Sequence, residues 1–294
     1  MPTRAIPTKA SVFTDEISED WEEAVRTAAE ASLKHVDIRN TWGKSCSALD
    51  RGDWRRMADI MERYDVRMGA IQSPFGKVQL DDEAGYRAQL AFLPDLIEQA
   101  HFFGTDVIRI FPFFQTDLTR TRVRPNLPAV LPRIVDRLQL AAKAAEAEGV
   151  WLALETEPST YSGSATETRM IVDAIGSPCL KIAWDAATAW MPDEPIFPDG
   201  YEQIRGLVVN VHVKERAHSR PARTGGAIFR HSSARGSCPG TRSSLRLRLM
   251  GTTACTASRP ISGARARTAG PSSRPPPRGS CTPCGSSWKR GCKG

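Results

Sequence analysis

Residues 11–216 alternate short apolar runs with longer stretches in which apolar residues recur at helical spacing. Short apolar runs are typical of buried strands, and the longer spacing is typical of amphipathic helices. The starts of successive runs lie about 33 residues apart, the length of one strand–helix unit. This alternation predicts a parallel sheet covered by helices. The predicted strands are Ser11–Ile17, His35–Asn40, Val66–Ser73, Asp106–Phe113, Val150–Thr156, Leu180–Trp184 and Leu207–Lys214.

The stretches between the strands carry helix start and stop signals. Asp20 with Glu23, and Ser164 with Glu167, have the spacing of a capping box. Glycine, which tolerates the left-handed conformation after a helix, follows two of the stretches. The first predicted helix begins after Asp20. The others are Trp54–Tyr64 with Asp53 as its cap, Asp82–Phe103 followed by Gly104, Leu127–Glu148 followed by Gly149, a helix that includes Met170–Ile175, and the short Gly200–Arg205.

Seven strand–helix units are one short of a complete TIM barrel. An open doubly wound sheet is the competing α/β fold, but it would normally carry a glycine-rich phosphate loop after the first strand. The segment FTDEISED at that position has no glycine. We therefore predict an α/β TIM barrel that is complete to about the seventh strand.

The net charge of +7 is the sum of two unlike parts. Residues 217–294 hold fifteen Lys and Arg and no Asp or Glu, which leaves 25 basic and 33 acidic side chains in residues 1–216. The second part is rich in Ser, Pro, Gly and Arg, a composition that does not support a hydrophobic core. We predict a catalytic barrel domain in 1–216 and a basic, low-complexity, disordered tail in 217–294.

Other readings of the tail are weaker. A nucleic-acid-binding arm would interleave aromatic residues with its basic ones, and the tail has only Phe229 and Trp288. Cys281 and Cys284 have half of a zinc-knuckle spacing, without a second pair. The opening segment MPTRAIPTKA has no apolar run, and no stretch is long enough to span a membrane. We expect a cytoplasmic protein without disulfides and without a nucleic-acid or membrane partner.

The chemistry of a parallel barrel lies at the carboxyl ends of its strands. The fifth, sixth and seventh predicted strands end in Glu155, Asp185 and His212. Two carboxylates and one imidazole suit Mn²⁺, Mg²⁺, Co²⁺ or Zn²⁺. Each residue also has a plainer interpretation: Glu155 as a solvated loop carboxylate, Asp185 as a cap of the next helix, and His212 as a core histidine.

Further polar residues at or near strand ends are candidate substrate contacts. Lys214 follows His212 by two positions and so shares its face of the strand, as Glu157 does with Glu155. Solvated rim positions are the alternative for the charged ones. The candidates are Arg39, Gln72, Arg109, Glu157 and Lys214.

The motifs LETEP, KIAWDAATAW, DGYEQI and VHVKE, in this order and spacing, resemble the sugar phosphate isomerase/epimerase family of xylose isomerase-like barrels. The resemblance covers roughly residues 11–216. It implies a divalent metal held by Glu, Asp, His and a final Glu from strands five to eight, with both glutamates moving the proton. Glu155, Asp185 and His212 match the first three ligands, and Glu155 also matches a catalytic base. Thr188 stands where the family often has His or Asn.

The resemblance implies isomerisation or epimerisation of a sugar, a sugar phosphate or a cyclitol, by proton transfer beside a carbonyl that the metal chelates. An abasic-site endonuclease on the same barrel would need more histidines at strand ends than His212. A noncatalytic sugar-binding barrel is the other alternative. The small-molecule substrate, the metal and the oligomeric state, a homo-oligomer included, are left open.

No predicted strand ending in Glu follows Lys214, so the fourth ligand and second acid are missing. We hypothesise that the reading frame changes between Lys214 and about Gly226, because GC-rich coding sequence read out of frame yields such a composition. In the shifted frame, the third base of each codon is read together with the first two bases of the next codon. The degenerate code then allows this frame to encode GEGQLPWHE across Ser233–Arg242 and DGYDGVYSLETHF across Leu249–Ser262. Both resemble the family's next segments. The chain as written is therefore expected to be impaired.

Overall fold

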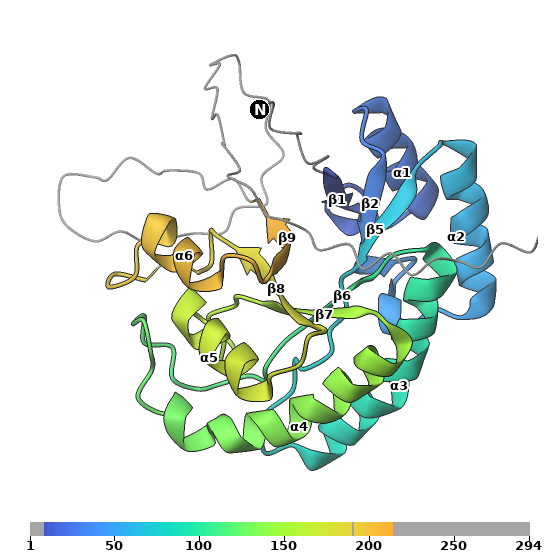
Figure 1. The fold of residues 1–294 in the computed structure, drawn as a ribbon. Helices are drawn as coiled ribbons and strands as arrows, with labels where there is room; N and C mark the ends of the chain where they lie inside the picture. The colour runs from blue at the N-terminus through green and yellow to red at the C-terminus, as the bar shows by residue number, and fades with distance from the viewer. Residues whose placement is uncertain (1–8, 190, 214–294) are drawn as a thin grey trace, which may run out of the picture. The chain divides into compact units, whose positions relative to one another are not determined.

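The computed structural model describes residues 9–189 and 191–213, all within the unit Met1–Ala254. Its main sheet has seven parallel strands in the order β1-β2-β5-β6-β7-β8-β9, and helices cover its outer side (Figure 1). This confirms the predicted barrel-type sheet. The strands are β1 Ser11–Phe13, β2 His35–Ile38, β5 Arg67–Ile71, β6 Val107–Ile110, β7 Trp151–Glu155, β8 Leu180–Asp185 and β9 Val208–His212.

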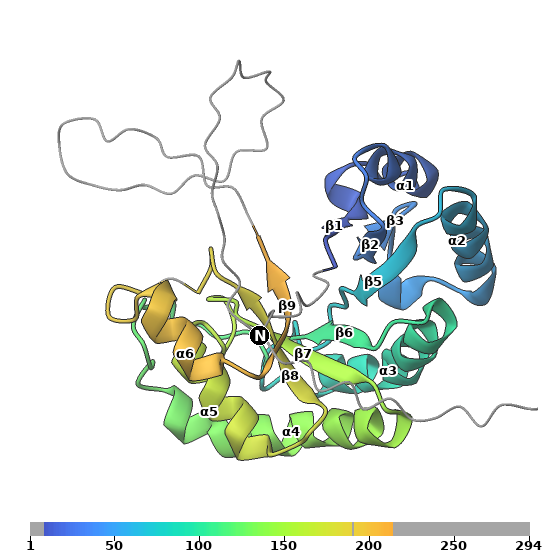
Figure 2. The ribbon, with the colours of Figure 1, turned by 45° about the horizontal axis from the view of Figure 1, so that its top comes forward.

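Strands β1 and β9 are the two ends of the described sheet (Figure 2). The predicted tail, 217–294, lies outside the described residues, so the structure does not test its predicted disorder or the predicted change of reading frame. No helix in the described part of the chain is long and apolar enough to cross a membrane. The predicted first strand, Ser11–Ile17, is too long, because Thr14–Glu16 form a helical turn directly after Phe13.

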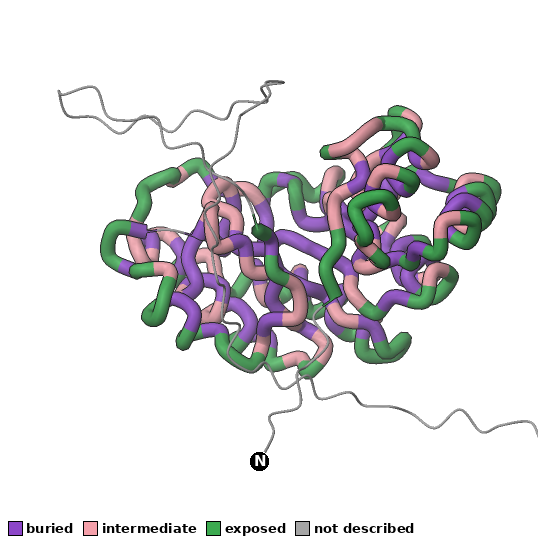
Figure 3. Tube along the Cα trace, turned by 90° about the horizontal axis from the view of Figure 1, so that it is seen from above, coloured by how far each residue is buried: buried purple, intermediate pink, exposed green. Residues whose placement is uncertain are grey.

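The helices bury one face each against the sheet, and Figure 3 shows exposed residues at the outer turns of the trace and buried residues in its interior. Gly104 and Gly149 end the two longest helices at positive φ, 69° and 70°, as predicted. Near the chain start, β3 (Asn40–Thr41) and β4 (Lys44–Ser45) form a short hairpin that the pattern did not predict. The helices are α1 Trp21–Glu30, α2 Arg51–Arg63, α3 Glu83–Phe103, α4 Leu127–Glu148, α5 Ala165–Ile175 and α6 Tyr201–Ile204.

The prediction that Asp53 caps the second helix is wrong. Helix α2 begins at Arg51, and the Asp50 carboxylate accepts bonds from the backbone N–H groups of Gly52 and Asp53 at 2.7 and 2.9 Å. The Asp53 side chain instead accepts from the Asp50 N–H at 3.1 Å, as the second member of a capping box. Asp20 and Ser164 cap α1 and α5 by accepting from the N–H groups of Glu23 and Glu167. The reciprocal halves of the two predicted capping boxes do not form, because the Glu23 carboxylate accepts from the Ser18 hydroxyl and the Glu167 carboxylate from Arg124.

Backbone pairing joins the loops that follow β5, β6 and β7. Phe114 bridges to Gln79 in one neighbouring loop and to Thr160 in the other. The Phe111 N–H donates to the carbonyl of Phe75 at 2.8 Å, which brings the loop after β5 against the end of β6. These loops therefore form a fixed layer at the carboxyl ends of the strands, where chemistry is expected.

Candidate metal centre

Glu155, Asp185 and His212 end three adjacent strands, β7, β8 and β9. The register places Asp185 opposite His212 and Glu155 opposite Ala183. Because neighbours in register share a face of the sheet and Ala183 lies two residues before Asp185, all three side chains project from the same face. The structure brings the three predicted ligands together.

The three side chains are close enough to hold one ion. One ligand atom from each residue lies within 4.8 Å of those of the other two. The His212 Nδ1 atom is 3.2 Å from Oε1 of Glu155. The residues are 3%, 0% and 5% exposed in chain order. Glu155 is therefore not a solvated loop carboxylate.

The plainer interpretations of Asp185 and His212 also hold in part. Oδ1 of Asp185 accepts from the N–H groups of Ala187 and Thr188 at 3.0 and 3.1 Å, so this carboxylate does shape the turn after β8. The His212 ring packs edge-to-face on Phe13, with 5.2 Å between ring centroids. These contacts orient both groups and leave the triad geometry intact, so they are compatible with metal binding.

The donor set fits a divalent cation. Two carboxylates and an imidazole are buried together, and buried carboxylates are costly unless they are paired or bound to metal. The Nε2 atom of His212 is buried and has no hydrogen-bond partner among the described residues. Oxygen ligands with one imidazole suit the metals expected from the sequence, Mn²⁺, Mg²⁺, Co²⁺ and Zn²⁺. Glu155, Asp185 and His212 are the residues that would hold it.

Arg109 lies inside the site. Its guanidinium is 3.1 Å from Oε2 of Glu155, and both side chains are almost fully buried. It also donates to the carbonyl of Gln72 at 2.9 Å. Burial lowers the pKa of Arg109, and the charge of Glu155 raises it. A substrate contact by Arg109 stays a prediction, and its contact with Glu155 is what the structure adds.

The other predicted substrate contacts are spread around the centre. Gln72 is buried, and its amide donates to Asp37 at 2.8 Å. Arg39 is half-buried and pairs with Asp15 at 2.7 Å. The carboxylate of Glu157 accepts from the N–H of Ser159 at 3.2 Å. Lys214 lies outside the described residues. The roles of all four in substrate binding stay predictions.

Sequence reasoning missed three residues of this region. Phe13, at the end of β1, touches His212. Asp37 of β2 is buried, and burial raises its pKa despite the bond from Gln72. Lys77 lies in the loop after β5, with its ammonium 4.3 Å from the centroid of the Phe111 ring. Asp37 could have been suspected as a charge inside an apolar strand, whereas Lys77 has no sequence signal.

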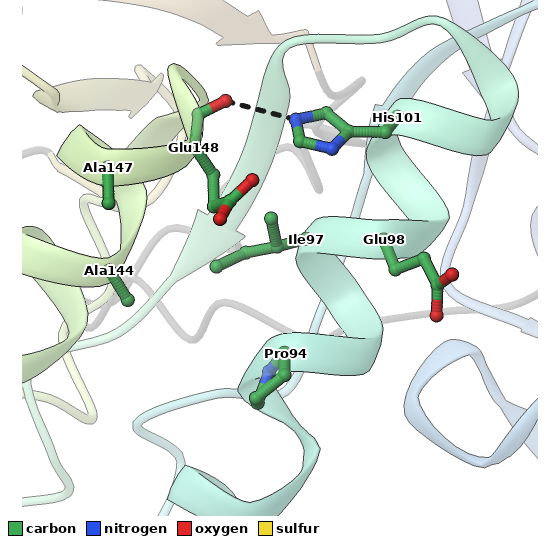
Figure 4. Close-up of a pocket in the computed structure, with 7 residues that line it drawn as sticks. All are labelled: Pro94, Ile97, Glu98, His101, Ala144, Ala147 and Glu148. Atoms are coloured by element: carbon green, nitrogen blue, oxygen red, sulfur yellow. Dashed lines mark hydrogen bonds between the residues drawn. The ribbon is translucent and has the colours of Figure 1, made fainter. Parts of the chain in front are cut away.

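A separate groove lies between helices α3 and α4 (Figure 4). In it the ring of His101 is hydrogen-bonded to the carbonyl of Glu148 at 3.1 Å. None of its lining residues is a predicted site residue, so it is not part of the metal centre. They are Pro94, Ile97, Glu98, His101, Ala144, Ala147 and Glu148.

Solved structures with this fold include sugar epimerases. A 3-keto-D-glucoside 4-epimerase from E. coli is 13% identical, with a TM-score of 0.58, over 73% of this chain and 82% of that one. A D-psicose 3-epimerase from Clostridium cellulolyticum H10, solved with D-tagatose, is 15% identical, with a TM-score of 0.57, over 74% and 77%. A xylose isomerase-like TIM barrel protein from Mycobacterium smegmatis, solved with magnesium, is 17% identical, with a TM-score of 0.56, over 71% and 74%.

At these identities the likeness establishes the fold alone. No curated protein sequence matches the chain significantly. The family model described as "Xylose isomerase-like TIM barrel" matches residues 25–243, more than half of the chain. This confirms the resemblance first noted in the LETEP and VHVKE motifs. The chain belongs to the xylose isomerase-like TIM barrel family.

Proposed function

We propose that this chain is built as a metal-dependent isomerase or epimerase of a sugar, a sugar phosphate or a cyclitol. The observation that supports it best is the buried Glu155, Asp185 and His212 group, whose ligand atoms lie within 4.8 Å of one another at the carboxyl ends of adjacent strands. Carboxylates at this position of a parallel barrel are typical of catalysis rather than of stability.

Glu155 is the proposed base. When bound, the divalent metal would polarise a substrate carbonyl and so acidify the neighbouring C–H group. A carboxylate within hydrogen-bond reach of that carbon can then take the proton. Arg109, 3.1 Å from Glu155, holds the carboxylate in place. Arg39, Gln72, Arg109, Glu157 and Lys214 are the proposed substrate contacts.

Epimerisation needs a second acid, to return the proton on the opposite face of the carbon. We propose that this acid, which is also the fourth ligand, is the Glu of SLETH in the shifted frame across Leu249–Ser262. The chain as written would then bind metal through three protein ligands and turn over poorly. Sequencing the locus tests this: stop codons in the shifted frame across Ser233–Arg242 and Leu249–Ser262 would exclude it.

Metal binding tests the site on the chain as written. We expect Mn²⁺ to bind at one site in equilibrium dialysis, and D185N and H212A to weaken binding at least about tenfold. E146Q removes a carboxylate from the exposed surface of α4 and is the matched control. Equal affinities in all four proteins would exclude the proposed centre.

Activity tests the reaction on a frame-restored chain. With Mn²⁺ and a panel of keto-sugars, we expect exchange of a carbon-bound proton with solvent deuterium and the appearance of a second sugar. E155Q should lower the rate about 10²- to 10⁴-fold, the usual contribution of a positioned base. Metal binding without any proton exchange across the panel would favour the noncatalytic sugar-binding alternative.

A further inference from the structure

Three cationic side chains and two aromatic rings alternate along one side of the site. Arg39 lies over the Phe13 ring, with 5.0 Å from Cζ to the ring centroid. Arg109 lies between the two rings, 5.9 Å from Phe13 and 4.8 Å from Phe111. Lys77 completes the row, with its Nζ atom 4.3 Å from the Phe111 centroid. We name these five residues the cation–aromatic row.

Two of the three cations in the row already have anionic partners. Arg39 pairs with Asp15 at 2.7 Å, and Arg109 pairs with Glu155 at 3.1 Å. Lys77 has no ion pair or side-chain hydrogen bond within the described residues. Its positive charge is therefore the one in the row that remains available to a ligand.

The position of Lys77 is fixed by its own loop. Gly76 has φ of +87°, and a Cβ atom there would lie 1.7 Å from the carbonyl oxygen of Phe111. Only glycine therefore allows the loop to approach Phe111 so closely. The Gly76 N–H is also bonded to the side chain of Gln89 at 2.6 Å, and the Lys77 N–H to the carbonyl of Pro74 at 2.9 Å. A loop held this tightly sets the lysine over the ring.

The electrostatic surroundings of Lys77 are those of the candidate site. Although the residue as a whole is exposed, partial burial lowers its pKa, and the charge of Arg109 lowers it further. The charges of Glu155 and Glu157 act in the opposite direction. Lys77 shares the Phe111 ring with Arg109, and Arg109 contacts the proposed catalytic carboxylate at 3.1 Å, so the row leads from Lys77 to the proposed metal centre.

We infer that Lys77 binds an acidic group of the substrate, a carboxylate or a phosphate, and so selects acidic sugars or cyclitols over neutral ones. The inference rests on the proposed function, because it assigns the substrate class of the same site. An ammonium on a flexible stem, held against an aromatic ring, is a suitable partner for an oxyanion. The neutral part of the substrate would then face the metal centre.

Site-specific acylation tests the contact on the full chain with Mn²⁺. Lys77 is labelled with a limiting acylating reagent and quantified by peptide mass spectrometry, alone and with D-fructose 6-phosphate, D-fructose, D-glucuronate or D-glucose. We expect at least one acidic probe to slow acylation of Lys77 about fivefold or more, since a bound anion occupies the amine, while its neutral partner does not. The phosphate and the carboxylate arms identify which acid is preferred. Lys143, exposed on α4, is the internal control.

Substitution tests the selectivity. In K77M the affinity ratio of the acidic to the neutral probe should fall about tenfold or more, K77R should restore most of it, and K143M should leave it unchanged. G76A keeps the lysine but displaces its loop and should lose the ratio as K77M does. Absence of protection by both acids, or an unchanged ratio in K77M, overturns the inference. Mn²⁺ affinity, measured on the same samples, depends on Asp185 and His212 and reports separately on the proposed function.

Discussion

The guanidinium of Arg109 lies 3.1 Å from the carboxylate of Glu155, and these side chains are only 7% and 5% exposed. The pair joins β6 to β7 at Glu155, one of the three proposed metal ligands. Its arrangement follows from the register, because Arg109 is opposite Ala153, two residues before Glu155. A buried cation beside a proposed ligand limits how the carboxylate can turn, and it compensates the charge when no metal is bound.

Replacing Arg109 tests this compensation. R109M leaves the Glu155 charge buried without its cation, so we expect the free energy of unfolding in EDTA to fall by about 3–5 kcal/mol. The loss should be smaller with saturating Mn²⁺, because the metal supplies positive charge to the same carboxylate. Urea unfolding followed by circular dichroism measures both values.

The matched control for R109M is R26M. Arg26 and its partner Glu30 are 50% and 65% exposed on the surface of α1, where an ion pair contributes at most about 1 kcal/mol. Mn²⁺ should not change its effect. Equal losses for R109M in EDTA and in Mn²⁺ would mean that Glu155 and the metal do not interact.

The sequence was sufficient for the features that depend on local pattern. Strand and helix periods are local, so all seven strands and the glycine stops at Gly104 and Gly149 could be predicted. The proximity of Glu155, Asp185 and His212 could be predicted because the carboxyl ends of parallel strands meet at one edge of the sheet. The error at α2 was also local, because both Asp50 and Asp53 are good caps and only the structure distinguishes them.

Contacts between loops could not be predicted. The position of Lys77 depends on the approach of Gly76 to Phe111, residues 35 positions apart in the printed numbering. Glu167 has the sequence signature of a capping-box residue, yet its carboxylate is bound to Arg124, 43 positions away. Such pairs depend on the path of the loops after the strands, which no hydrophobic period specifies.

The Arg124–Glu167 pair gives a prediction about stability. Both side chains are almost completely buried, and the guanidinium also donates to the carbonyls of Pro158 and Thr160 at 2.7 Å. R124M and E167Q should each cost about 3–5 kcal/mol, because each leaves the other charge buried and unpaired. The double variant should cost clearly less than the sum of the two, since no charge is then left alone.

Chemical denaturation of the four proteins in this cycle measures the coupling. R169M with D173N is a matched cycle, because this pair lies on the exposed surface of α5. Its coupling should be below about 1 kcal/mol. Strict additivity for Arg124 and Glu167 would show that the carbonyl contacts, and not the ion pair, hold the loop after β7.

The buried carboxyl of Asp37 predicts a pH dependence. Burial raises its pKa in the folded protein above the usual 3.8, although the Gln72 amide donates to it. Because the pKa is higher in the folded than in the unfolded protein, the protonated carboxyl favours the folded state. This contribution to stability is full below the unfolded pKa and is lost as pH rises through the folded pKa. D37N removes this loss, so its stability relative to the parent should increase as pH rises from about 4 toward neutrality.

Urea unfolding of D37N and the parent protein at a series of pH values measures the difference. The gain should level off once the pH exceeds the folded pKa of Asp37. D136N, a change of the same kind on the exposed surface of α4, should leave the pH dependence of the parent unaltered. A difference between D37N and the parent that does not change with pH would show that Asp37 does not titrate between the folded and unfolded states.

The thiol of Cys46 gives the last prediction. Cys46 is 1% exposed, and burial raises its pKa to about 11. At pH 8 only about one molecule in a thousand would carry the reactive thiolate, even if the reagent could enter. We expect iodoacetamide to label Cys179, which is half-buried, well before Cys46 in the native protein, and to label both in urea. Peptide mass spectrometry measures the two rates. Because the folded pKa exceeds the unfolded 9.0, the thiol's contribution to stability is complete below pH 9.0 and declines as pH rises toward 11. C46A should therefore lose less stability than the parent protein as pH rises across that interval. In the labelling experiment, modification of native Cys46 as fast as that of Cys179 would contradict the burial of Cys46 under α3.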